Sequence, residues 1–102
     1  MTTIIVLFNL NENVSMADYE KWAKETDLPT ARALPSVDKF ELLKSEGLLI
    51  SDEASPYQYI ELLTINNMDQ FGKDVSTEVM QQVASEFQAF ADNPLFILTS
   101  TL

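Results

Sequence analysis

The sequence contains no cysteine and no histidine among its 102 residues. Without cysteine the chain can form no disulfide, no thiolate nucleophile and no cysteine-ligated metal site. Without histidine it lacks the commonest general base and the commonest zinc ligand. Acid–base chemistry would therefore fall to carboxylates, tyrosines or lysines. No carboxylate spacing in the sequence indicates a metal site, and we expect neither a metal nor a cofactor.

Basic residues are scarce, because six Lys and Arg stand against sixteen Asp and Glu and give a net charge of −10. Such a field repels phosphate backbones and anionic membrane surfaces, so we expect no nucleic-acid partner and no membrane partner. The acids are spread along the chain, which favours a solubilising surface. The first residues show no basic segment and only a short apolar run, so the sequence predicts a soluble cytoplasmic protein.

Glycine occurs only at Gly47 and Gly72, so the sequence has no glycine-rich loop of the kind that binds phosphate. The length is typical of one domain, and we expect residues 1–102 to form it. No linker, low-complexity tract or internal repeat divides the chain.

The hydrophobic pattern changes between strand and helix character along the chain. Strands are predicted at 3–10, 37–44, 57–65 and 95–102. Ser15 is a predicted N-cap with Asp18 as its partner, and this helix should end or kink near Asp27 because Pro29 follows. Shorter helical turns are predicted at 30–34 and after Asn67. A second long helix should start from Asp74 or Ser76, run to about residue 91 and stop at Asp92-Asn93-Pro94.

This order of elements predicts the α+β class, with a ferredoxin-like β-α-β-β-α-β fold and a four-stranded antiparallel sheet. Both helices should cover the same face of the sheet. The predicted strands are apolar on both faces, so the uncovered face would be a larger apolar patch than a monomer usually exposes. We therefore expect a homodimer that packs these open faces together, with Leu48–Ile50 helping to seal the contact.

Three stretches carry a resemblance to a known family: ADYEKWAKETDLPTARALPSVDKF, PYQYIELLTIN and EFQAFADNPLFILT. The chain resembles the dimeric α/β-barrel superfamily and, within it, is similar to the REDY-like protein family. The resemblance implies a role in prodigiosin-type pigment biosynthesis, on the branch that builds the bipyrrole precursor. Other superfamily members often have histidine where this chain has Asp27, and a glycine where it has Ser36. Histidine chemistry and haem ligation therefore cannot be carried over.

The segment from Tyr19 to Phe40 concentrates rare side chains, which suggests a pocket there. Trp22 would be a stacking wall for a flat aromatic or pyrrolic ligand, or else an ordinary core tryptophan. Tyr19 shares its helix face and would supply a hydroxyl, or else only packing. Asp27, expected at a helix end where the macrodipole disfavours an anion, would have a raised pKa or be fully solvated. Arg32 would pair with Asp27 or a ligand anion, or form a surface ion pair.

Strand 57–65 places Tyr57, Tyr59 and Glu61 on one face. If that face meets the helices, two phenols and a carboxylate join the pocket, and a buried carboxylate needs a partner or a shifted pKa. If it meets the dimer partner, tyrosines are common there as well. Asp27 and Glu61 are the predicted catalytic residues. Tyr19, Trp22, Arg32, Tyr57 and Tyr59 are the predicted substrate-binding residues.

Two functional hypotheses remain at this point. The first is a cofactor-free enzyme that acts on a pyrrolic or polyketide-like metabolite, with a carboxylate or tyrosine moving a proton. The second is a non-catalytic protein of the same pathway that binds an unstable intermediate or a partner enzyme. An RNA-binding module with the same element order is excluded by the charge and by the missing basic-aromatic strand pattern.

Overall fold

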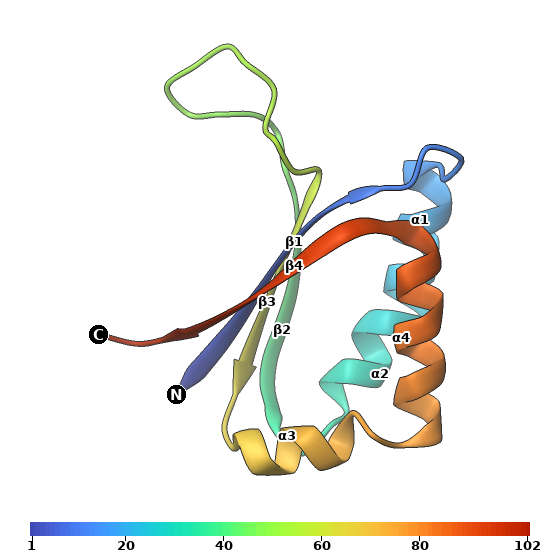
Figure 1. The fold of residues 1–102 in the computed structure, drawn as a ribbon, viewed down its shortest axis with the longest axis vertical. Coiled ribbons are helices and arrows are strands. Elements are labelled where there is room, and N and C mark those ends of the chain that lie inside the picture. Colours follow the sequence, from blue (N-terminus) through green and yellow to red (C-terminus); the bar gives the residue numbers. More distant parts are fainter.

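The structure, a computed structural model, describes all residues from Met1 to Leu102. Its helices and strands, shown in Figure 1, are β1 Thr2–Leu10, α1 Met16–Trp22, the π-helix η1 Ala23–Asp27, α2 Leu28–Arg32, β2 Val37–Lys44, β3 Tyr59–Ile65, α3 Met68–Asp74, α4 Glu78–Phe90 and β4 Ala91–Ser100. None of these helices is long and apolar enough to cross a membrane.

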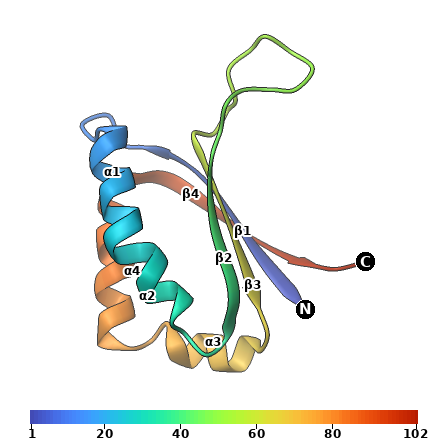
Figure 2. The ribbon, with the colours of Figure 1, turned by 180° about the vertical axis from the view of Figure 1, so that it is seen from behind.

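The four strands form one antiparallel sheet in the order β2-β3-β1-β4. The α1–η1–α2 segment and α4 lie on one side of the sheet. The short helix α3 lies past the lower ends of β2 and β3 (Figures 1 and 2). This arrangement confirms the predicted α+β, ferredoxin-like class. The sheet of the single chain is open, so one copy does not form a closed barrel.

The core lies between the sheet and the helices. Ile4, Val6 and Phe8 alternate along β1 and are buried under the helices. The Phe8 ring makes edge contacts with Phe87 of α4, at 5.0 Å between ring centroids, and with Tyr19 of α1 at 5.5 Å. Aromatic pairs of this geometry add to the stabilisation that burial provides. Both helices are thus fixed to the central strand by one phenylalanine.

The first helix was predicted to end or kink near Asp27. It does not end there but changes to a π-helix at Ala23–Asp27 and then continues to Arg32. The Leu28 N–H donates to the Ala23 carbonyl, five residues earlier, and so forms one wide π-helical turn. Pro29 then falls in the first turn of α2, where a missing N–H costs little. The wider turn also leaves room for a proline ring that would strain a regular helix.

The N-cap of the second long helix is Thr77, one residue after Ser76 and three after Asp74, the two predicted caps. The Thr77 hydroxyl oxygen accepts from the Met80 N–H. The two predicted caps have other partners. Ser76 donates its hydroxyl to the Gly72 carbonyl, and the Asp74 carboxylate binds Ser36 and Gln70.

The helix stops at Phe90, and β4 starts at once with Ala91, earlier than predicted. Asp92-Asn93-Pro94 is therefore part of this strand. Asn93 has a φ of 46°, and the pairing between β1 and β4 shifts between Leu7 and Asn9. An irregular strand can thus absorb residues that usually end an element. The third strand, β3, begins at Tyr59 and not at the predicted residue 57, so Tyr57 belongs to the connection before it.

The junction between α2 and β2 is held by a buried polar cluster. One oxygen of Asp74 accepts from the Ser36 N–H at 3.0 Å and from the Ser36 hydroxyl at 2.6 Å. The other accepts from Gln70 at 2.7 Å. These bonds lower the pKa of Asp74 and fix α3 beneath the sheet.

Replacing Asp74 by alanine should lower the free energy of unfolding by about 1–3 kcal/mol, because the buried Ser36 N–H and hydroxyl lose their acceptor. Asp69→Ala, an exposed acid on the same helix, is the matched control and should cost less than about 1 kcal/mol. Urea denaturation measures both variants. Equal losses for the two would show that the Asp74 cluster adds nothing beyond helix electrostatics.

Candidate active site

A cavity of about 190 Å³ lies between the helices and the sheet. Its walls are largely apolar, and the polar side chains among them are Asp27, Glu61 and Gln88. The complete lining is Ile4, Val6, Asp27, Ala31, Leu34, Phe40, Glu61, Leu63, Phe71, Val75, Met80, Val83, Ala84, Phe87, Gln88 and Phe96. Phe96 is 61% exposed although it lines the cavity, so the cavity opens toward solvent beside β4.

The π-helical turn brings Asp27 into this cavity. Tyr19, Ala23, Asp27 and Ala31 follow one another at four-residue spacing, and all four are buried. In a regular α-helix, positions four apart rotate by about 40° per step, so such a series would leave the inner face. The wide turn at Ala23–Asp27 offsets that drift. It thereby keeps Asp27 on the face that meets the sheet.

Glu61 reaches the same cavity from the middle of β3. It lies opposite Val6 of β1 and Leu42 of β2, both of which share its face of the sheet. Its side chain is 6% exposed, and Oε1 is buried with no hydrogen-bond partner. A buried carboxyl group without a partner is costly and uncommon in native structures.

Burial controls the protonation of both acids. Loss of solvation raises the pKa of Asp27 to about 6. Loss of solvation, followed by the negative charge of Asp27, raises the pKa of Glu61 to about 8. Of the two acids Glu61 has the higher pKa, so it holds its proton to higher pH, and Asp27 ionises first. The predicted cause of the raised pKa of Asp27, the macrodipole at the end of a helix, does not apply, because the helix continues past Asp27 into α2.

Tyr19 lies beside this pair but not on the cavity wall. Its ring is fully buried, and its hydroxyl oxygen has no hydrogen-bond partner. Burial, and then the charges of Glu61 and Asp27, raise the pKa of Tyr19 above its ordinary value. The hydroxyl is thus a neutral donor close to the two carboxyl groups.

Tyr59 belongs to a different polar group near the surface. Its hydroxyl donates to Glu20 at 2.6 Å, and Glu20 pairs with Lys44 at 3.0 Å. Burial and the Glu20 contact raise the pKa of Tyr59, while the bond from Tyr59 is the main cause of a lowered pKa at Glu20. Tyr59 lines a smaller hollow with Glu20 and Lys44, and its ring centroid lies 4.9 Å from that of Tyr19.

Trp22 and Tyr57 also lie off the cavity wall. The Trp22 indole packs on Phe90, at 5.1 Å between ring centroids, and donates its N–H to Glu86 at 2.9 Å. It is half-buried and joins α1 to α4. Tyr57 is half-buried in the connection before β3, and its backbone carbonyl accepts from the Ser55 hydroxyl.

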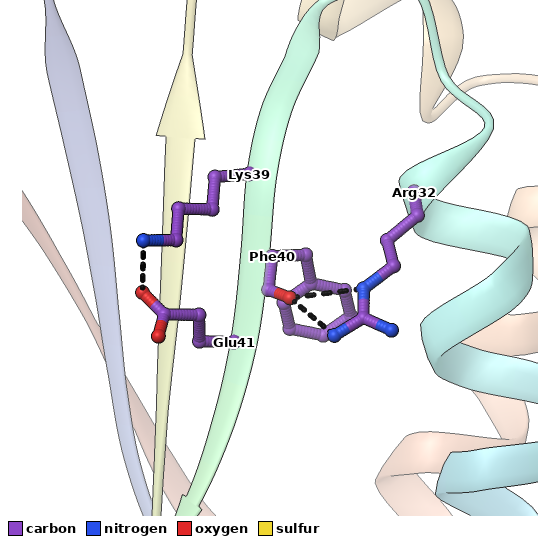
Figure 3. A network of polar contacts seen from close by, with 4 residues as sticks. All are labelled: Arg32, Lys39, Phe40 and Glu41. Atoms are coloured by element: carbon purple, nitrogen blue, oxygen red, sulfur yellow. Dashed lines mark hydrogen bonds and ion pairs between the residues drawn. The ribbon is translucent and has the colours of Figure 1, made fainter.

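Arg32 is held away from the acids. Its Nε and one terminal nitrogen donate to the Phe40 carbonyl at 3.1 and 3.0 Å, which fastens α2 to β2 (Figure 3). The same figure shows Lys39 and Glu41 as a 3.3 Å ion pair on the far side of β2. The guanidinium is not part of the cavity lining, so Asp27 faces the cavity without a cation.

The structure thus unites two of the predicted site residues, Asp27 and Glu61, with Tyr19 behind them. Several lining residues were not singled out by sequence reasoning, among them Phe40, Phe71, Met80, Gln88 and Phe96. Phe87 had been assigned to the core. Their apolar periodicity marks an inward face, but it does not distinguish a filled core from a hollow one.

The raised pKa of Glu61 predicts how stability depends on pH. Between pH 6 and 8 the folded chain keeps a proton on Glu61 that the unfolded chain has released, so the free energy of unfolding should fall as pH rises. The slope should approach roughly 1.4 kcal/mol per pH unit. Glu61→Gln, which stays neutral, should remove this slope and exceed the parent in stability at pH 8.

Chemical denaturation at pH 6, 7 and 8 measures this effect. Glu53→Gln, in the exposed connection before β3, is the control and should keep the parent slope. If Glu61→Gln and the parent showed the same pH dependence, Glu61 would be ionised throughout and its assigned protonation would be wrong.

Comparison with solved structures shows similar folds in proteins of several kinds. The chain is 27% identical to HapK from Hahella chejuensis, with a TM-score of 0.79 over 100% of this chain and 93% of that one. A dimeric ferredoxin-like protein from Thermobifida fusca is 14% identical, with a TM-score of 0.79 over 98% and 90%. SnoaB, a cofactor-independent oxygenase from Streptomyces nogalater, is 17% identical, with a TM-score of 0.76 over 99% and 92%.

A comparison with curated proteins finds no match. The family model described as REDY-like protein HapK, in contrast, matches residues 2–102, nearly the whole chain. By this match the chain belongs to the REDY-like HapK family.

Proposed function

We propose that this protein takes part in prodigiosin-type pigment biosynthesis and acts on a pyrrole or bipyrrole precursor bound in the cavity. Membership of the REDY-like HapK family supports the pathway, through the role that the resemblance implies. The observation that carries the catalytic part is that the Glu61 side chain, whose buried Oε1 has no hydrogen-bond partner in the chain, lines an otherwise largely apolar cavity together with Asp27. An acid kept in such a place is suited to meet a ligand.

The pair can move a proton without a cofactor. Asp27, ionised at neutral pH, is the base, and Glu61, which holds a proton, is the acid. Because both pKa values lie near neutrality, neither transfer is strongly uphill. A ring that loses a proton at one atom to Asp27 and gains one at another from Glu61 would be tautomerised with no net change of charge.

A second function is a carrier or accessory protein for an enzyme of the same pathway. The connection between β2 and β3 favours it, because this loop projects from the body of the molecule (Figures 1 and 2) and exposes Leu49 and Ile50 almost completely. Apolar side chains on a projecting loop are suited to contact another protein. In this alternative the cavity holds an intermediate but does not change it.

Titration with synthetic pyrrole and bipyrrole precursors separates these functions. We expect binding to the parent protein, measured by calorimetry, and a change in the absorption spectrum of the precursor as it tautomerises. Asp27→Asn and Glu61→Gln keep the shape of the cavity, so they should slow the reaction at least 100-fold, the loss expected when general acid–base catalysis is removed. Glu53→Gln is the surface control and should keep the parent rate.

Binding without any spectral change would favour the carrier function over catalysis. If no precursor bound at all, the proposed role of the cavity would be lost in both forms.

We further propose that the protein is a homodimer in which the open faces of two sheets pack together. The strand register places one set of apolar side chains opposite the helices, namely Ile5, Leu7, Leu43, Ile60, Leu62, Leu95 and Ile97. Nothing in the single chain covers them, and Leu43, Leu95 and Ile97 are more than 40% exposed. The projecting loop exposes Leu49 and Ile50, which would help to seal the contact. The dimeric Thermobifida fusca protein of similar fold supports this assembly.

Analytical ultracentrifugation at micromolar concentration should show a dimer. Leu62→Glu, at the centre of the open face, should give monomers, since each dimer would bury two carboxylates against apolar side chains. Ile97→Glu, at a more exposed position, makes the same test with less risk to folding. Val79→Glu is the control on the outer face of α4, where the side chain is 62% exposed, and should remain dimeric. A monomeric parent would contradict the proposal.

A further inference from the structure

Asp27 is a buried carboxyl group that has no partner within the chain. It is 7% exposed, and burial is the cause of its raised pKa, with no hydrogen bond or cation acting against it. The side-chain atoms that are sealed from solvent and unpaired are the Tyr19 hydroxyl oxygen and Glu61 Oε1. The unpaired oxygens of Asp27 are not sealed in this way. The accessible surface that they keep therefore lies at the cavity, which Asp27 lines.

No cation of the chain neutralises Asp27. The cavity lining contains no lysine or arginine. Both ion pairs of the chain are formed by other acids. Arg32 follows Asp27 on the same helical segment, but its donors are engaged with the Phe40 carbonyl. An ionised Asp27 thus depends on the occupant of the cavity for a positive charge.

The other walls of the cavity also favour a cation over an anion. Phe40, Phe71, Phe87 and Phe96 contribute aromatic rings, whose faces attract positive charge. The net charge of −10 draws cations toward the protein and repels anions. A cavity of about 150 Å³ with apolar walls holds one benzene molecule. The volume of about 190 Å³ found here therefore suits one aromatic ring with a small substituent.

We infer that the cavity binds a small aromatic ring with a cationic N–H group, and that Asp27 holds this group as an ion pair. This specificity rests on the proposed function and deepens it, because it gives the charge of the ligand that the same cavity takes. Asp27 has already lost its water in the fold, so only the ligand must be desolvated when the pair forms. A positively charged N–H also releases its proton more easily than a neutral one, which suits the proposed transfer to Asp27.

Benzamidine, benzamide and benzoate make a matched set of probes. They share a planar ring with a planar three-atom substituent, and they carry a positive charge, no charge and a negative charge. Benzamidine should bind at least about tenfold more tightly than benzamide, because hydrogen bonds between charged groups are stronger than neutral ones. Benzoate should bind at least about tenfold more weakly than benzamide, because it would face Asp27 with a like charge.

NMR titration in about 0.15 M salt, where long-range attraction is screened, measures these affinities. The shifts of the Asp27 and Ala31 amides show whether a probe occupies the cavity.

Asp27→Asn tests the group that selects the charge. It keeps the shape of the side chain and removes its charge, so the preference for benzamidine over benzamide should fall to less than about threefold. Asp52→Asn, in the exposed connection before β3, is the matched control. It changes the net charge by the same amount and should keep the preference of the parent.

The parent protein gives a second test that needs no variant. The pKa of Asp27 is raised to about 6, so most of its charge is lost between pH 7 and pH 5. Glu61, with a pKa of about 8, and the Tyr19 hydroxyl stay largely protonated over this range, and the cavity wall has no other titratable group. Benzamidine keeps its charge, so its affinity should fall about five- to tenfold, while that of benzamide should not change.

Equal binding of benzamidine and benzamide to the parent would overturn the selection by charge. A preference that persisted in Asp27→Asn would do the same, because the cation would then bind elsewhere. If the pyrrole and bipyrrole precursors bound and reacted in spite of such a result, or when no probe bound, the proposed function would stand alone. If neither the precursors nor any probe bound, both proposals would fail together.

Discussion

One wide helical turn determines how this small protein can hold a site. The hydrogen bond from the Leu28 N–H to the Ala23 carbonyl adds a residue to the turn and keeps Asp27 on the inner face. In a regular helix Asp27 would be turned about 80° from Tyr19, toward the flank of the inner face. The pair, and with it the difference between a base and an acid at neutral pH, depends on this local irregularity.

The same turn explains why the sequence predicted the outline of the fold but not the path of its first helix. The order of strands and helices follows from hydrophobic period and caps, and Ser15 indeed accepts from the Asp18 N–H as expected. Pro29 was interpreted as an end or a kink because proline usually breaks or kinks an α-helix. A π-helical turn has no sequence pattern of its own, so its accommodation of the proline could not be predicted.

The candidate site was predictable only in part, for a related reason. The alternation along β3 placed Glu61 with Tyr59 on one face but did not decide whether that face meets the helices or a second copy. In the structure this face meets the helices, and the buried Glu61 carboxyl has a raised pKa, as expected for that alternative. Rarity of a residue type was a poorer guide. Trp22 and Arg32 are single in the sequence, yet both join elements, through Glu86 and through the Phe40 carbonyl. Whether facing apolar residues leave a hollow depends on three-dimensional packing, which a linear pattern does not contain.

Two buried acids of this chain show how a functional carboxylate differs from a structural one. Asp74 accepts three hydrogen bonds, and its pKa is lowered, so its charge strengthens the fold. Glu61 has an oxygen without a partner, and its pKa is raised, so its charge weakens the fold. An apolar side chain at position 61 would fill the same face of β3 without this loss. The fold therefore carries at Glu61 a cost that no hydrogen bond within the chain offsets, as is typical of a residue that is kept for function rather than for stability.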